Sequence, residues 1–240
     1  MIFTISARSK PDGVSIIDFL KTSYSNIPLS SIDSVFGFVE KSTLYGGRPF
    51  YEPELTQDDV ALLKQNKIGL RIPFTNHHAS RDEYEQHQSM LDKYHIKGNS
   101  VILTNDDLAK WIREDFPKYR IEASVIKNIN THKKINQAFE LYDTVVLPMK
   151  INNDHDFLKK VKNKKHVTLF ANAGCALTCP SKLCYPSISK ANKFNGGEIL
   201  CSQSMKYREM HGMIDFELEK LVALGFTRFK VLRSRGFSGY

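Results

Sequence analysis

Short apolar runs separated by helix-like segments recur along almost the whole chain, and this rhythm limits the folds that it can adopt. Eight such runs in 240 residues match the number of strands in a (β/α)8 barrel near the lower end of its usual size. A doubly wound open sheet is the alternative, since it alternates strands and helices in the same way. The runs cover residues 35–40, 68–74, 100–103, 121–126, 144–148, 166–171, 198–201 and 228–232.

The residues that follow the runs favour the barrel. Polar side chains come directly after most predicted strands, and barrel enzymes gather these positions on one face. We therefore predict an α/β protein with a single TIM-like (β/α)8 barrel domain over residues 1–240, complete or distorted. We expect about the first 30 residues to form a helical extension that covers the bottom of the barrel.

Several of these polar residues are candidates for the site, although each could simply begin a turn or cap a helix. Amides can hold polar substrate groups, and cationic side chains near the last strands can meet a carboxylate or phosphate. The candidate catalytic residues are Asn76, Asn105 and Asn172. The candidate substrate-binding residues are Arg48, Lys150, Lys230 and Arg233.

The net charge of +8 is unevenly distributed. Residues 1–150 carry 19 basic and 19 acidic side chains, so the excess lies in residues 151–240. Such a bias predicts an anionic partner, either a small molecule or RNA. A lysine-rich run at 159–165 could also be an ordinary solvated helix face, and no named nucleic-acid-binding motif accompanies it.

The sequence also predicts where the protein resides. No apolar run approaches the roughly 20 residues that span a bilayer, and the N-terminus does not resemble a secretory signal. We expect a cytoplasmic protein that acts alone, as a homo-oligomer or in a heteromeric pair.

All four cysteines lie within a window of 27 residues, which is the most specific chemical signal in the chain. In a reducing compartment such a group indicates metal binding more often than disulfides. The irregular spacing and the proline after the second cysteine favour a [4Fe-4S] cluster over structural zinc, which usually has paired CxxC knuckles. A radical S-adenosylmethionine site or four reduced structural cysteines are the other readings. The candidate ligands are Cys175, Cys179, Cys184 and Cys201.

Three segments resemble the U-32 peptidase family, also called the collagenase-like peptidases. LFANAGCALTCPSKLCY resembles a cysteine-rich loop that follows a strand ending in Asn, and GEILCSQS is similar to the family's cysteine-containing strand end. LVALGFTRFKVLRSRG is similar to a later strand element of the family, with matches at Gly225, Phe226, Phe229, Lys230, Val231 and Arg233. Together the matches cover roughly residues 166–236.

The resemblance implies a barrel-like catalytic domain and, as in some branches, a [4Fe-4S] cluster held by four cysteines. The resemblance thus implies oxygen-independent hydroxylation of a ubiquinone precursor ring or of RNA bases, as in those branches, with prephenate as the oxygen source. The first three cysteines are closer together here than is usual in the family. This departure puts the role of Cys184 as a cluster ligand in question.

Three functional hypotheses follow from these observations. The first is an iron-sulfur oxidoreductase of U-32 type that hydroxylates an anionic or RNA substrate. The second is a zinc-dependent hydrolase on the same barrel, although no HExxH or GxSxG motif occurs. The third is a non-catalytic, metal-stabilised RNA-binding protein.

Overall fold

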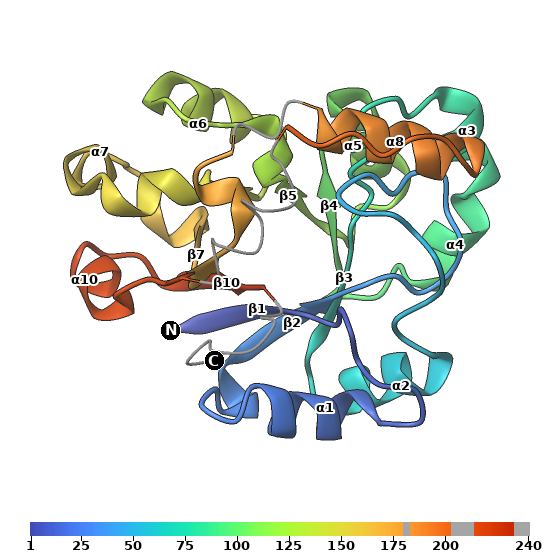
Figure 1. Ribbon diagram of the computed structural model, residues 1–240, viewed down its shortest axis with the longest axis horizontal. Helices are drawn as coiled ribbons and strands as arrows, with labels where there is room; N and C mark the ends of the chain where they lie inside the picture. Colours follow the sequence, from blue (N-terminus) through green and yellow to red (C-terminus); the bar gives the residue numbers. More distant parts are fainter. Residues whose placement is uncertain (180–182, 203–213, 233–240) are drawn as a thin grey trace.

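A closed barrel of eight parallel strands forms the centre of the protein, as the sequence predicted (Figure 1). The computed structural model describes residues 1–179, 183–202 and 214–232. Around the barrel the strands follow the order β1-β10-β7-β6-β5-β4-β3-β2. Their bounds are β1 Ile2–Ser6, β2 Ile32–Phe36, β3 Gly69–Ile72, β4 Ser100–Leu103, β5 Arg120–Ala123, β6 Thr144–Val146, β7 Val167–Phe170 and β10 Arg228–Val231.

The helices of the outer layer begin where polar side chains can cap free main-chain N–H groups. Thr56 and Ser80 each form a capping box, and the side chain of Asn105 accepts hydrogen bonds from the first turn of its helix. The helices described are α1 Ile16–Ser23, α2 Gln57–Gln65, α3 Arg81–Gln86, α4 Gln88–Lys93, α5 Asp106–Asp115, α6 His132–Ala138, α7 His155–Lys159, α8 Cys184–Phe194 and α10 Leu218–Ala223.

Short 3-10 helices also occur among the described residues. They are η1 Leu29–Ser31, η2 Val125–Lys127, η3 Met149–Asn153, η4 Lys164–His166 and η5 Cys175–Leu177. Among the described residues, no helix has both the length and the apolar character needed to cross a membrane.

The main hydrophobic core lies between the strands and the helices. Alternate residues of each strand point outward into this layer, and Phe229 and Val231 of β10 are fully buried there beside Phe3 and Ile5 of β1. The residues between them point into the barrel, where many are polar. This interior departs from the branched aliphatic layers typical of such barrels.

Two details of the sequence-based prediction are wrong. The first residues do not lie outside the barrel, because Ile2–Ser6 is its first strand and pairs with β10 and β2. Residues 198–201 form no strand, and Ile199 and Leu200 are each 41% exposed. The first run was overlooked because it is short and alternates with polar residues. The second run is not buried by any of the described residues.

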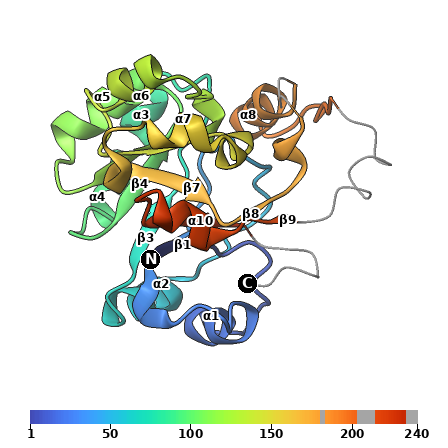
Figure 2. The same cartoon turned by 90° about the vertical axis from the view of Figure 1, so that its left-hand side faces the viewer.

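The connection between β7 and β10 differs from the other crossovers. After β7 the chain forms β8 (Asn172–Ala173), which pairs antiparallel with β9 (Ile214–Asp215), so the two strands make a ribbon at the base of a long excursion. Helix α8 belongs to this excursion and lies away from α7 and α10 (Figure 1), and Lys193 near its end forms an ion pair with Glu83 of α3. Figure 2 shows α8 and the ribbon at one end of the barrel. We call residues 174–202, within the described range, the cap.

Candidate active site at the barrel mouth

A buried ion pair crosses the middle of the barrel. Arg71 of β3 and Glu122 of β5 are 0% and 1% exposed, and Arg71 Nη1 donates to Glu122 Oε2 at 2.7 Å. The hydroxyls of Thr144 and Thr168 donate to the same oxygen at 3.0 and 3.1 Å. Burial alone would raise the pKa of Glu122, but the charges of Arg71 and Lys230 outweigh it and hold that pKa below its ordinary value.

A second group of charges closes the N-terminal end of the barrel. Asp33 Oδ2 accepts hydrogen bonds from Arg120 at 2.6 Å, Arg71 at 3.1 Å and Arg228 at 3.3 Å. Although burial opposes ionisation, these three guanidinium groups keep the pKa of Asp33 below its ordinary value. Because Asp33, Arg120 and Arg228 lie at the starts of their strands, the network is remote from the face where barrel enzymes place their chemistry.

Lys230 lies in the barrel interior near the opposite end. It is the third residue of β10, is 6% exposed, and has Thr4 and Phe170 as its strand neighbours. Its Nζ is 4.3 Å from the centroid of the Phe36 ring, at the end of β2. Burial lowers the pKa of Lys230 to about 8; Glu122 opposes this shift, while Arg71 and Arg48 add to it.

Gly46 and Gly47, in the segment YGGRP at residues 45–49, let the loop after β2 approach the end of β3. A Cβ atom on Gly46 would lie 2.3 Å from the Thr75 carbonyl oxygen, so only glycine fits without a shift of the backbone. Arg48, in the same segment, forms an ion pair with Glu54 and places its Cζ 4.2 Å from the centroid of the Phe38 ring. Arg48 therefore lies on the mouth side of the barrel, close enough to Lys230 to disfavour its charge.

Helix α8 is fastened across these loops by polar contacts. Asn192 Nδ2 donates to the carbonyls of Tyr45 at 3.0 Å and Arg48 at 2.9 Å, and its Oδ1 accepts from the Phe50 N–H at 2.9 Å. Lys193 forms an ion pair with Glu83 of α3 at 2.7 Å. These contacts hold the C-terminal part of α8 over the loops that follow β2 and β3.

Asn76 supports the same arrangement from the loop after β3. It is fully buried, and its Nδ2 donates to the carbonyls of Thr43 at 2.6 Å and Ser189 at 2.9 Å. Its Oδ1 accepts from the His78 N–H at 2.8 Å. The amide thus joins two mouth loops to α8.

The other candidate polar residues occupy different environments. Asn105 Oδ1 accepts from the N–H groups of Asp107 and Leu108, as a helix cap does. Asn172 exchanges two hydrogen bonds with the main chain of Leu232, at 2.8 and 3.0 Å. Lys150 is exposed on η3, and Arg233 lies outside the described residues.

The four cysteines all lie on the cap: Cys175 begins η5 and Cys179 follows it, Cys184 begins α8, and Cys201 comes after the end of α8. The Cys179 N–H donates to the Cys175 carbonyl at 3.1 Å. Cys184 begins α8, where the Ser187 hydroxyl donates to its carbonyl and accepts from the N–H of Leu200, next to Cys201. Within the described ranges, no group of three or more His, Cys, Asp or Glu side chains is arranged around a common metal position.

The sequence analysis identified Lys230 but missed the ion pair of Arg71 and Glu122 and the charged residues of the N-terminal end. A signal for two of them was present, since Arg71 interrupts the apolar run IGLRIPF and Glu122 the run RIEASVI. A charge inside a buried strand needs a partner of opposite charge. The identity of that partner depends on strand register, which the sequence alone does not give.

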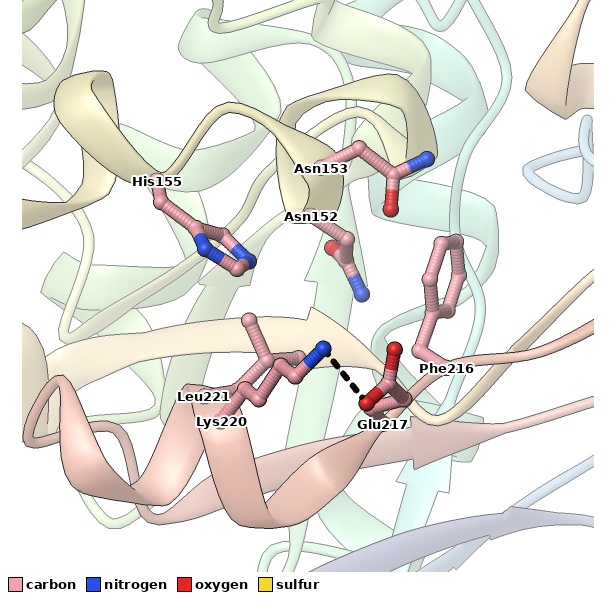
Figure 3. A pocket seen from close by; sticks show the side chains of 7 residues that line it. All are labelled: Asn152, Asn153, His155, Phe216, Glu217, Lys220 and Leu221. Atoms are coloured by element: carbon pink, nitrogen blue, oxygen red, sulfur yellow. Dashed lines mark ion pairs between the residues drawn. The ribbon is translucent and has the colours of Figure 1, made fainter.

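A separate pocket lies on the outer wall of the barrel. It has a volume of about 170 Å³ and is lined from the η3–α7 region by Asn152 and His155, and from the α10 region by Phe216 and Lys220 (Figure 3). Asn152 Nδ2 donates to the carbonyl of Phe170 at 2.6 Å, and its buried Oδ1 has no hydrogen-bond partner among the described residues.

The fold recurs in a solved structure. The U32 peptidase Mk0906 matches 98% of this chain over 94% of its own length, with a TM-score of 0.68 and 15% sequence identity. The chain has the fold of a U-32 peptidase. The resemblance seen in the cysteine-rich loop and in the last strand is therefore accompanied by a likeness that extends over nearly the whole chain.

The other comparisons add little. A fusion protein of a xylose isomerase-like TIM barrel and 4-hydroxyphenylpyruvate dioxygenase matches all of this chain over 40% of its own length, with a TM-score of 0.48 and 14% identity. No protein-family model and no curated protein sequence matches the chain.

Proposed function

We propose that this U-32-like barrel is an enzyme whose cap holds a [4Fe-4S] cluster at the barrel mouth, and that it acts on a small anionic substrate there. The reaction class that we propose is an oxygen-independent hydroxylation or a related redox step. The observation that carries the proposal is the location of Cys175, Cys179, Cys184 and Cys201 on the single excursion that rises from the C-terminal ends of the strands.

The four cysteine side chains of the cap are chemically suited to hold such a cluster. Four thiolates are the usual ligands of [4Fe-4S] clusters, and the cap supplies four cysteines. Cluster binding would bring these four side chains together around one centre. A bound cluster would supply one-electron chemistry beside the substrate.

The charges of the barrel support an anionic substrate. Its interior and ends hold more cationic than anionic side chains, with Lys230 and Arg48 on the mouth side. Cations in a site that excludes water attract carboxylates and phosphates strongly. In this proposal Arg48 and Lys230 bind and orient the anionic group, while α8 limits the access of water to the mouth.

Cysteine variants test the proposal. Each of Cys175→Ser, Cys179→Ser, Cys184→Ser and Cys201→Ser, purified anaerobically, should lose most of its bound iron, because a thiolate ligand is removed. Thr178→Ser, between the first pair, is the matched control and should keep the wild-type iron content. Full iron content in all four cysteine variants would refute the assignment. About one zinc per wild-type chain, without iron or sulfide, would instead favour the zinc hydrolase.

A further inference from the structure

The ammonium group of Lys230 lacks the partners that normally accompany a buried charge. Among the described residues it forms no ion pair within 4 Å and no hydrogen bond, and its Nζ lies 4.3 Å from the centroid of the Phe36 ring. Buried lysines are rare without a carboxylate partner. The nearest such group, Glu122, directs its Oε2 to Arg71, Thr144 and Thr168 instead.

Three charged groups around Lys230 determine its protonation. Glu122 favours the ammonium form, whereas Arg71 and Arg48 oppose it, and burial opposes it most strongly. Lys230 is therefore partly a neutral amine near neutral pH, whereas an exposed lysine is almost fully protonated. A neutral, desolvated amine is the nucleophile that enzymes use to attack carbonyl carbons.

We propose that Lys230 is a nucleophile that captures a small oxo acid as an imine at the barrel mouth. The geometry behind this proposal is an inward-facing amine on the last barrel strand, beside the end of β2 and close to Arg48. The inference goes beyond the proposed function, since imine formation requires no cluster.

The step balances without an added oxidant or reductant. The neutral amine nitrogen attacks the carbonyl carbon and forms a C–N bond, giving a carbinolamine. The carbon–oxygen bond then breaks, and the oxygen leaves as water with both protons of the amine. Glu122 Oε1, buried and without a hydrogen-bond partner among the described residues, is the nearby acceptor available for a proton in transit.

The surrounding charge indicates which carbonyl compounds would be captured. Arg48 lies on the mouth side of the barrel, close to Lys230, so a carbonyl compound that also carries an anionic group is favoured there over a neutral one. An oxo acid carries both the carbonyl carbon and the carboxylate.

Reductive trapping tests the inference on the full chain, purified anaerobically. The protein is treated with glyoxylate and cyanoborohydride, which reduces the imine to a stable secondary amine. Cleavage after Glu219 releases residues 220–240, which contain both Lys220 and Lys230, so one peptide carries the exposed control and the proposed nucleophile. At pH 7 the adduct should form about tenfold faster on Lys230, and its rate should reach half-maximum near pH 8.

Two further experiments test the preference for an oxo acid and the identity of the reacting lysine separately. Propanal, an uncharged aldehyde, should label Lys230 more slowly than glyoxylate does; equal rates would overturn the oxo-acid assignment. Lys230→Arg, which keeps the positive charge, should remove the adduct at this position and leave labelling of Lys220 unchanged. A Lys230 that stays unlabelled, or that reacts with the rate and pH dependence of Lys220, would overturn the inference. Iron measured on the same sample tests the proposed function separately.

Discussion

At the N-terminal end of the barrel Asp33 receives hydrogen bonds from three arginines, whereas near the C-terminal end Lys230 lies against the face of the Phe36 ring and has no ion-pair partner among the described residues. Both ends place charge inside the barrel, but only at the first do the charged groups form ion pairs. Charges that are paired in this way stabilise the arrangement of the strands. A buried charge without such partners lowers stability and is retained where it serves chemistry.

The ion pair in the middle of the barrel should show the largest effect on stability. Arg71→Met leaves Glu122 buried without its cationic partner and should lower the free energy of unfolding by about 3–5 kcal/mol, as measured by urea denaturation. Arg81→Met, which removes an exposed helix pair with Glu85, is the control and should leave the urea midpoint unchanged. Equal behaviour of the two variants would mean that the interior pair does not support the fold.

The hydrogen bonds of Asn76 that join the mouth loops to α8 should show the next largest effect on stability. Asn76→Ala leaves the carbonyls of Thr43 and Ser189 without their donor and should cost about 2–3 kcal/mol. Amide hydrogen exchange should also become faster in residues 184–194 than in α5, which Asn76 does not touch. Unchanged exchange in α8 would show that other contacts hold the cap.

Replacing Lys230 near the mouth should raise the free energy of unfolding, whereas the two changes above lower it. Lys230→Met removes a poorly paired buried charge and should stabilise the protein at pH 7 by about 2 kcal/mol. The pKa of Lys230 is about 8 in the folded chain and higher in the unfolded chain. Between these values the unfolded state binds more protons, so wild-type stability rises with pH.

The same variant tests this sign through its pH dependence. The gain in the free energy of unfolding from Lys230→Met should be full below pH 8 and should shrink towards pH 10. Urea denaturation at pH 7 and at pH 10 measures it. If the variant were less stable than the wild type at pH 7, the contrast between the two ends of the barrel would be wrong.

The smallest effect is expected at a helix end. Asn105→Ala removes the cap of α5 and should cost about 1 kcal/mol, measured as a shift of the thermal midpoint. Asn105→Asp, which keeps an acceptor at the same position, should restore most of the loss. A loss of activity without a loss of stability in Asn105→Ala would instead assign the residue to the substrate site.

The order of strands and helices could be predicted from the sequence because short buried runs and capped helices leave local signals. Helix α5 shows such signals together, since it has a cap at Asn105, a polar first turn and a buried stripe. The strand Ile2–Ser6 was missed because its inward residues, Thr4 and Ser6, are polar. Polar interior residues make a barrel strand look like an exposed segment.

The site was predicted less completely than the fold. The cysteines and Lys230 have a recognisable spacing and local sequence, whereas the partners of Arg71 and Asp33 depend on strand register. The position of α8 could not be foreseen either, because the contacts of Asn192 and Lys193 join it to loops more than 100 residues earlier in the chain.

The most direct test of the proposed cluster is the metal content of the wild-type protein. Iron, sulfide and zinc should be determined on one anaerobically purified sample, together with its absorption spectrum. The account predicts a brown protein with about four iron and four sulfide per chain. A colourless protein that holds neither iron nor sulfide, even after anaerobic reconstitution, would contradict it.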